Sequence, residues 1–175
     1  LKDMEVEDEK NLIIGSYIER NDPRDAFISF NYNSLKELNN NIVGSSSRRR
    51  ELQLKLINKN IKVKQIRGNV DTRIKKLKEN FYDGIVLAIA GIKNLGLEKN
   101  VKEIFSLDDV IPSAGQGVIA AQCRKEDERI KKILNKVNSP ITKQCSISER
   151  SMLKTIGGNC DTAVGALATV IGDEI

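Results

Sequence analysis

The segment 44-GSSSRRRELQLKL-56 holds the residues that most clearly suggest chemistry, because a glycine and three serines precede three consecutive arginines. Ser46 or Ser47 can cap a helix that begins here, since a serine hydroxyl accepts a hydrogen bond from a free backbone N–H of the first turn. Free N–H groups at a helix start attract anions, and an arginine binds a carboxylate or phosphate through two parallel hydrogen bonds. The segment therefore predicts an anion-binding site.

The charge of the chain agrees with an acidic ligand but does not identify it. The 175 residues contain 29 basic and 24 acidic side chains, and residues 48–78 are strongly basic, with only Glu51 and Asp71 opposing the positive charges. A run of charges is most often a solvated surface. Nucleic acid is a weak interpretation, because aromatic residues make up only 4% of the chain and none lies between the arginines to stack on bases. We expect no nucleic-acid partner.

The residues that are missing exclude several kinds of catalysis. The chain has no histidine, which excludes Ser-His and Cys-His catalysis and the common histidine metal sites within it. Its three cysteines, Cys123, Cys145 and Cys160, are odd in number and unclustered, so they predict neither a disulfide framework nor a zinc site. We expect no metal. Any chemistry must use carboxylates, thiols, lysines or arginines.

Hydropathy predicts a soluble, cytoplasmic protein. No apolar run approaches the roughly 20 residues that cross a bilayer, and no basic and apolar leader opens the chain.

The middle of the chain alternates strand and helix patterns. Short apolar segments at 42–44 and 61–67 predict strands, and the spacing of Val70, Ile74 and Leu77 predicts a helix between the second strand and the next. Residues 84–92 are apolar on both faces, as in a central parallel strand. This order predicts an α/β fold with βαβ crossovers and a parallel sheet.

The flanking regions predict pieces of other domains. Strands are expected at 12–18 and 118–123, separated from the middle region by the turn signals 21-NDPRD-25 and 112-PSAGQG-117. Two amphipathic helices follow, one over 130–137 and one over 146–156, and residues 163–171 have a β-type pattern.

Four motifs, in this order and spacing, resemble the porphobilinogen deaminase (hydroxymethylbilane synthase) family, and the resemblance covers essentially the whole chain. They are Lys2-Asp3; 44-GSSSRRRELQL-54; 67-RGNVDTRIKKL-77 with 82-YDGIVLAIAGIKNLGL-97; and 112-PSAGQGVIAAQCR-124 with 149-ERSMLKTIGGNCDTAVGA-166. The resemblance implies a fragment that lacks the N-terminal part of domain 1 and most of domain 3. It also implies a periplasmic-binding-protein-like two-domain architecture with a small α+β third domain. The implied boundaries are 1–20 and 118–136 for domain 1, 22–111 for domain 2, 112–117 for a hinge and 140–175 for the start of domain 3.

Such enzymes condense four porphobilinogen molecules head to tail into hydroxymethylbilane, with release of ammonia, in tetrapyrrole and haem biosynthesis. These enzymes are monomers, and they build the product on a dipyrromethane cofactor that is bound covalently to a cysteine. Each pyrrole carries an acetate and a propionate, so the anion implied for the arginines is a polycarboxylate. Carried onto this chain, the family motifs imply Asp3 as the catalytic residue; Cys160 (thioether to dipyrromethane), Lys2, Ser47, Arg49, Arg50 and Arg67 as cofactor-binding residues; and Arg73 and Gln116 as substrate-binding residues.

Several positions depart from the family pattern. Asn94 stands where an arginine is often found, with Lys93 beside it as a replacement, and Arg48 occupies a position that is usually apolar. The glycines around Gln116 can alternatively serve only a turn. The alternative function is a non-catalytic anion-binding module of periplasmic-binding-protein type, which needs the same arginines but has no reason to attach a tetrapyrrole precursor to Cys160.

Overall fold

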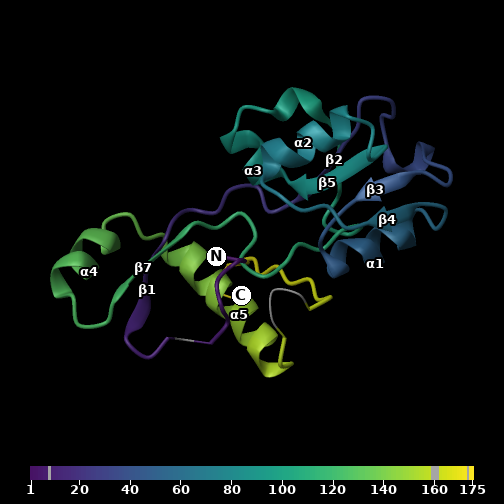
Figure 1. Ribbon diagram of the computed structural model, residues 1–175. Coiled ribbons are helices and arrows are strands. Elements are labelled where there is room, and N and C mark those ends of the chain that lie inside the picture. The colour runs from purple at the N-terminus through teal and green to yellow at the C-terminus, as the bar shows by residue number, and fades with distance from the viewer. Residues whose placement is uncertain (8, 159–161, 173) are drawn as a thin grey trace. The chain divides into compact units, whose positions relative to one another are not determined.

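The computed structural model describes residues 1–7, 9–158, 162–172 and 174–175. These residues form two compact units (Figure 1). Unit 1 comprises residues 1–21 and 113–175, and unit 2 comprises residues 22–112.

Unit 2 is built on a mixed five-stranded sheet with the order β4-β3-β5-β2-β6. Its strands are β2 (Asp25–Ile28), β3 (Ile42–Gly44), β4 (Lys62–Lys64), β5 (Gly84–Ala88) and β6 (Val101–Ile104). The pairs β3-β4 and β3-β5 are parallel, as predicted. The prediction of a wholly parallel sheet is wrong, because β2 lies antiparallel to both β5 and β6. Strands β2 and β6 were not predicted; Asp25, the first residue of β2, lies in the segment 21-NDPRD-25, whose pattern indicates a turn.

The helices of unit 2 are α1 (Arg48–Ile57), α2 (Val70–Lys78) and α3 (Ile89–Asn94), with short 3-10 turns at Leu35–Glu37 (η1) and Glu98–Asn100 (η2). Ser47 caps α1 by accepting a hydrogen bond from the backbone N–H of Arg50, which confirms the expected helix start. Asn69 caps α2 in the same way, through the N–H of Thr72. Helix α1 connects the adjacent parallel strands β3 and β4, and α2 connects β4 to β5, which lies parallel on the other side of β3, as βαβ crossovers require.

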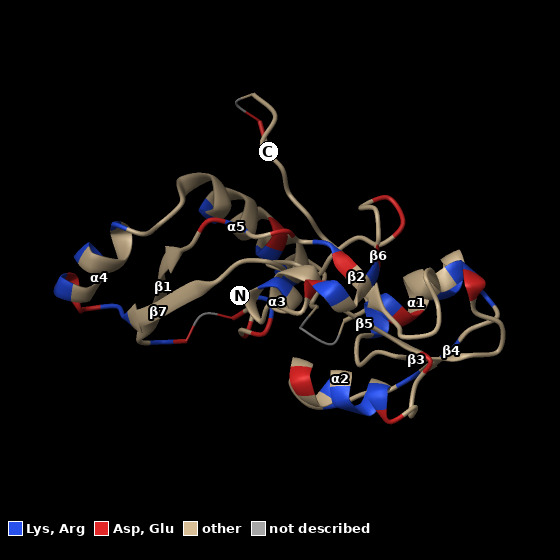
Figure 2. Cartoon of the chain, turned by 90° about the horizontal axis from the view of Figure 1, so that it is seen from above, with Lys and Arg blue, Asp and Glu red and all other residues tan. Residues whose placement is uncertain are grey.

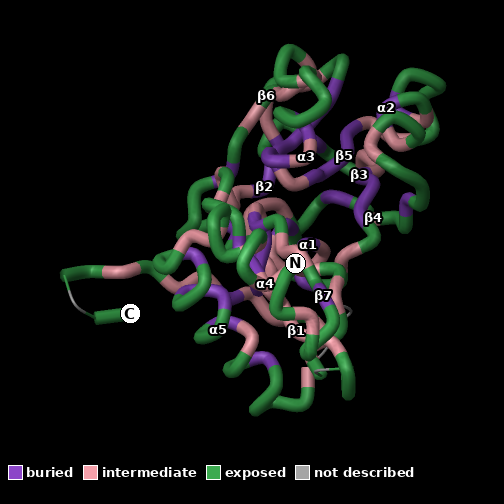
Figure 3. The backbone as a smooth tube through the Cα atoms, turned by 90° about the vertical axis from the view of Figure 1, so that its left-hand side faces the viewer, coloured by how far each residue is buried: buried purple, intermediate pink, exposed green. Residues whose placement is uncertain are grey.

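Strands β2 and β5 are buried on both faces of the sheet (Figure 3). Successive side chains of a strand point to opposite faces of the sheet. Phe27 and Val86 pack with Leu54 of α1 on one face. Their neighbours in β2 and β5 pack against α2 and α3 on the other face. Unit 2 is therefore a three-layer α/β structure with a core on each side of the sheet.

The apolar segment predicted as one strand over 84–92 divides into two elements. Strand β5 ends at Ala88 and α3 begins at Ile89. Ile89 and Ile92, three residues apart on α3, are buried in the same core cluster as Ile85 and Leu87. A short apolar run does not distinguish a buried strand from a buried helix, and here it contains both.

Unit 1 contains the antiparallel pair β1 (Leu12–Tyr17) and β7 (Ala120–Arg124), followed by the helices α4 (Glu128–Asn135) and α5 (Pro140–Thr155). Helix α5 begins earlier than predicted, because Ser139 caps it and Pro140 is accommodated in its first turn, where no hydrogen-bonded N–H is needed.

The β-type pattern at 163–171 is a wrong prediction, since the described residues 162–172 contain only an isolated bridge from Ile171 to Glu174. A strand needs a partner strand for its backbone groups, and this segment pairs with none in the described part of the chain. Within that part, no helix is both long enough and apolar enough to cross a membrane.

Candidate functional site

A buried cluster of charges in unit 2 joins the start of α1 to the start of β2. The Ser47 cap places Arg49 and Arg50 in the first turn of α1, and Asp25 is the first residue of β2. Nη2 of Arg49 lies 2.8 Å from Oδ2 of Asp25, and Nη2 of Arg50 lies 2.7 Å from Oδ1. Nη1 of Arg49 donates to the carbonyl of Ile111 at 2.6 Å, and Nη1 of Arg50 donates to the carbonyl of Val86 at 3.2 Å. One carboxylate therefore orients two arginine side chains.

The three side chains of the cluster are withdrawn from solvent: Asp25 is 0% exposed, Arg49 3% and Arg50 5%. Burial by itself raises the pKa of Asp25, but the positive charges of Arg50 and Arg49 and the hydrogen bonds from both outweigh it, so the pKa falls to about 2. Asp25 is consequently ionised at neutral pH. Burial lowers the pKa of Arg49, an effect that Asp25 opposes. Arg49 stays protonated, because a guanidinium group is not deprotonated in proteins.

The cluster also contains hydrogen-bond donors without a partner. The Nε atoms of Arg49 and Arg50 are buried and have no hydrogen-bond partner among the described residues. Because two arginines pair with one aspartate, the cluster carries a net charge of one positive unit. A buried donor without a partner is costly, and a bound carboxylate would satisfy it. The arginines were predicted from the sequence, whereas Asp25 was missed. Its signal is a charged residue at the edge of a buried strand, which needs an opposite charge nearby.

The other predicted residues of unit 2 lie in neighbouring loops. Strands β3 and β4 are parallel and adjacent, so the serines after β3 and Arg67 after β4 follow the same edge of the sheet. The hydroxyl of Ser46 donates to the carbonyl of Ile66, and the N–H of Ser45 donates to the carbonyl of Lys64 at 3.0 Å. These contacts bring the two loops together. The structure thus places Ser47 and Arg67 on adjacent segments.

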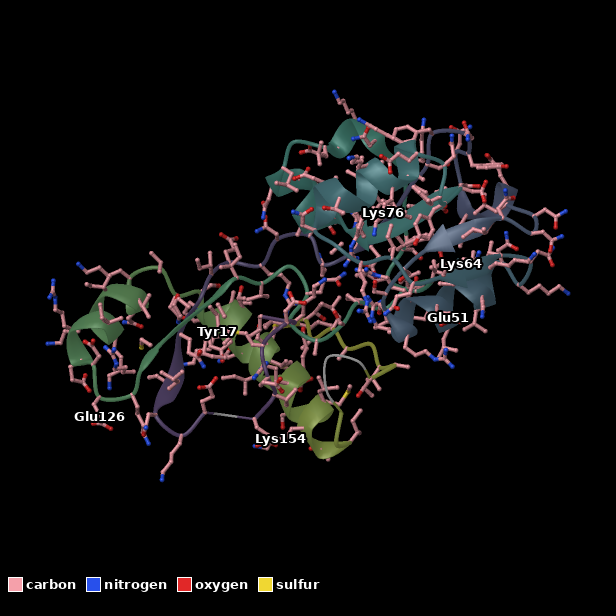
Figure 4. The ribbon with its side chains drawn as sticks, viewed as in Figure 1. Tyr17, Glu51, Lys64, Lys76, Glu126 and Lys154 are labelled. Atoms are coloured by element: carbon pink, nitrogen blue, oxygen red, sulfur yellow. The ribbon has the colours of Figure 1, made fainter. Side chains whose placement is uncertain are left out.

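Arg67 and Arg73 differ in how firmly they are held. The side chain of Arg67 is exposed. The backbone carbonyl of Arg67 accepts a hydrogen bond from Nζ of Lys76 at 3.0 Å (Lys76 is labelled in Figure 4). Arg73 is half-buried on α2 and donates from Nε to the carbonyl of Gly68 at 2.7 Å. Gly68 has a φ of 116°, which favours glycine, so this turn depends on the glycine of the motif. Basic residues predominate along α2 (Figure 2).

In unit 1 the structure brings Lys2 and Gln116 together. Nζ of Lys2 donates to Oε1 of Gln116 at 3.4 Å, and Gln116 is fully buried in the turn that precedes β7. Asp3 follows Lys2 and is exposed. The predicted cofactor residue Cys160 lies outside the described residues, whereas Cys123 and Cys145 are buried, as expected of small apolar side chains.

The positions that depart from the family pattern have ordinary surroundings. Arg48 is exposed and pairs with Glu51 of its own helix at 3.1 Å. Nζ of Lys93 lies 3.5 Å from Oδ2 of Asp22, and Asn94 is exposed. Lys93 therefore forms an ion pair with a carboxylate of the same unit.

Comparisons with known proteins agree with this fold. The chain is similar to a lipoprotein of Bacillus subtilis named for methionine binding, with 15% identity and a TM-score of 0.51 over 77% of this chain and 64% of that one. A Salmonella typhimurium periplasmic binding protein of high arginine specificity has 15% identity and a TM-score of 0.44 over 83% of this chain and 71% of that one. The likeness to the Bacillus subtilis lipoprotein shows a shared α/β fold.

The sequence comparisons are more specific. The profile described as "Porphobilinogen deaminase, dipyromethane cofactor binding domain" matches residues 1–132. The porphobilinogen deaminase of Exiguobacterium sibiricum is 41% identical over 175 residues, which cover 99% of this chain and 57% of that protein. The chain belongs to the porphobilinogen deaminase family and spans a little over half the length of this curated relative.

Proposed function

We propose that the chain is part of a hydroxymethylbilane synthase, a transferase that condenses four porphobilinogen molecules head to tail and releases ammonia. The observation that carries this proposal is the cluster in which Asp25 orients Arg49 and Arg50 and leaves their buried Nε donors without partners. A family whose substrate, cofactor and product all carry carboxylates needs such a site. The remainder of the enzyme would come from sequence beyond this chain, in line with the greater length of its relative.

The residues present fit a dipyrromethane cofactor. Its acetate and propionate groups match the charge and hydrogen-bond donors of Ser47, Arg49, Arg50 and Arg67 in unit 2, and the positive charge of Lys2 in unit 1. We assign the covalent thioether to Cys160. When bound, the cofactor supplies the pyrrole carbon to which the first substrate is joined. The residues of this chain would hold its carboxylates and keep the charges balanced.

Asp3 is the proposed catalytic residue. Loss of ammonia from porphobilinogen leaves a cationic azafulvene, and a carboxylate beside the pyrrole nitrogen stabilises that charge and accepts a proton as the new bond forms. Asp3 is exposed and follows Lys2, whose ammonium group is held by Gln116. Arg73 and Gln116 are the proposed substrate-binding residues, and Arg73 is already oriented by the carbonyl of Gly68.

The proposed setting is a cytoplasmic monomer that binds porphobilinogen and neither nucleic acid nor membrane. The chain by itself should show little or no turnover, because residues that bind cofactor in this family lie outside it. Turnover by the isolated chain near that of the complete enzyme would contradict this statement.

The intact mass of the denatured complete protein tests the function. The protein is produced in cells that supply porphobilinogen, beside a Cys160→Ser variant and a Cys123→Ser control. We expect a mass increment of two condensed pyrrole units in the parent and the control, absent from Cys160→Ser. An unmodified parent that is folded would refute the assignment and favour a non-catalytic anion-binding module.

A further inference from the structure

The chain passes between unit 1 and unit 2 twice, and each passage lies next to a residue that Arg49 binds. Unit 2 starts at Asp22 and ends at Pro112. Asp25, shortly after the first boundary, accepts a hydrogen bond from Nη2 of Arg49 at 2.8 Å. Ile111, directly before Pro112, accepts one from Nη1 of Arg49 at 2.6 Å. A single guanidinium group therefore bonds to the segment by which the chain enters unit 2 and to the segment by which it leaves.

Gln53 holds the second of these segments through its side-chain amide. Its Oε1 accepts a hydrogen bond from the backbone N–H of Ile111 at 2.7 Å, and its Nε2 donates to the backbone carbonyl of Ile111 at 3.1 Å. Gln53 lies one turn after Arg49 on α1, so the two side chains are neighbours on one face of the helix. A carbonyl oxygen has two lone pairs, and that of Ile111 accepts from both Arg49 and Gln53. Both backbone polar groups of Ile111 are thus bound to α1.

The position of Ile111 depends on these polar contacts, because its side chain contributes little to the core. Ile111 is 44% exposed, whereas Val110 before it is 1% exposed and packs in a core cluster with Leu54 of α1. Pro112 after it has no N–H and donates no hydrogen bond. Ile111 is therefore the last residue of unit 2 with a backbone N–H, and Gln53 accepts the hydrogen bond from it.

The first segment is fastened mainly to the sheet. The carbonyl of Arg24 accepts a hydrogen bond from the N–H of Ile89 at 3.0 Å, and the carbonyl of Asp25 accepts one from the N–H of Phe105 at 3.0 Å. The side chain of Arg24 also pairs with Asp22 at 2.7 Å. This segment keeps backbone contacts that do not involve α1, so it serves as an internal reference for the second segment.

The third edge of the Arg49 guanidinium group connects these contacts to the carboxylate site. A guanidinium group is planar and rigid, so its donors keep fixed positions relative to one another. Nη1 and Nη2 of Arg49 are bound to Ile111 and Asp25, and the buried Nε atom has no hydrogen-bond partner among the described residues. A ligand carboxylate at Nε would hold the group on its remaining edge. Since the group moves as one body, the ligand would also restrict the motion of both Nη contacts.

We propose that Gln53 is a positioning residue that, together with Arg49, couples occupation of the carboxylate site to the segment by which the chain leaves unit 2. This inference rests on the proposed function. Gln53 touches neither ligand nor reacting atoms. It holds the backbone of Ile111 in the place where Arg49 meets it, and Arg49 is the residue that meets the ligand. Without Gln53, a ligand on Arg49 restrains Ile111 through one hydrogen bond only.

The test measures backbone amide hydrogen exchange by mass spectrometry in the complete protein, produced with and without a supply of porphobilinogen. Gln53→Met removes both hydrogen bonds to Ile111 while keeping a similar side-chain length and helix preference. The control is Gln144→Met, the same change at an exposed glutamine of α5. Exchange is compared, relative to the buried strand β5, in three peptides: 45–50 for the carboxylate site, 22–28 for the first segment and 108–112 for the second.

We expect porphobilinogen to slow exchange in all three peptides of the parent and of Gln144→Met, by roughly 5- to 10-fold at the amide of Ile111, the effect of about one hydrogen bond. In Gln53→Met the slowing should persist at 45–50 and 22–28 but fall below about twofold at 108–112.

Two results would overturn the proposal. One is an equal slowing at 108–112 in Gln53→Met and in the control. The other is exchange at 108–112 that Gln53→Met accelerates by the same factor with and without porphobilinogen, which would leave a purely structural contact. An absence of slowing at 45–50 in the parent would instead refute the proposed function, and this inference with it, so the two failures are distinguishable.

Discussion

Oδ1 of Asp25 lies 2.7 Å from Nη2 of Arg50, in a cluster where the carboxylate is fully buried. The same carboxylate holds Arg49 through its second oxygen, so one aspartate sets the direction of two adjacent arginines of α1. It neutralises only one of their two charges. The protein's own carboxylate fixes the arginines in place, and the remaining donors and charge are those that we propose bind the carboxylates of a ligand.

Removal of the Asp25 charge should destabilise the protein strongly. The substitution Asp25→Asn leaves two buried guanidinium groups without their counter-charge, and breaking a buried ion pair in this way costs about 3–5 kcal/mol of unfolding free energy. The measurement is chemical denaturation of the complete protein, with Asp108→Asn, at an exposed aspartate, as the control. An unfolding free energy equal to that of the control would show that the cluster does not support the fold.

Stability should decline at acid pH through Asp25 and Asp22. The pKa of each falls from 3.8 to about 2; for Asp22 the hydrogen bond from Arg24 is the main cause. A lowered carboxyl pKa stabilises the folded state fully above the unfolded value, and this contribution is lost as pH falls through the folded value. The thermal midpoint should therefore drop between about pH 4 and pH 2. In Asp22→Asn the drop should be shallower; an unchanged slope would contradict the assignment.

Arg67 should affect ligand binding much more than stability. Its side chain is exposed, so Arg67→Ala should leave the thermal midpoint nearly unchanged. A charge-assisted hydrogen bond to a carboxylate is worth about 1.5–3 kcal/mol, which predicts a loss of roughly 10-fold or more in kcat/KM. Lys78→Ala, at the exposed end of α2, is the matched control. Equal kinetics for the two variants would remove Arg67 from the site.

Gly84 should tolerate no side chain, whereas Gly91 should. A Cβ atom at Gly84 would collide with the ring of Phe27 in the core of unit 2, so Gly84→Ala should lower the unfolding free energy by about 1–3 kcal/mol. A Cβ at Gly91, in α3, would find only Val70 Cγ2 at 3.9 Å. Gly91→Ala should be neutral or stabilising by up to about 1 kcal/mol, since alanine favours a helix. Denaturation curves that rank the two variants in the opposite order would contradict this packing.

Short-range signals allowed much of the structure to be predicted. Several features involve only residues within a few positions of one another: the cap at Ser47, the start of α1 and the spacing of Val70, Ile74 and Leu77. They can therefore be recognised in the sequence without a tertiary structure. The motifs that identify the family are also local.

Other features depended on residues far apart in the chain. Strand β2 was not recognised from its own residues, and its backbone groups pair with β5 and β6 on either side. The division of 84–92 into β5 and α3 was decided by the core that Ile89 and Ile92 enter. The absence of a strand at the described residues 162–172, beyond one bridge, reflects the lack of a pairing partner there.

The amino-acid sequence by itself determined which residues carry charge, where α1 and α2 begin and to which family the motifs point, because these depend on local chemistry. Only the tertiary structure decided that Asp25 joins Arg49 and Arg50, and that Arg49 also binds the carbonyl of Ile111. Buried charges must find opposite charges and hydrogen-bond partners wherever the fold places them, and sequence distance does not reveal where that is.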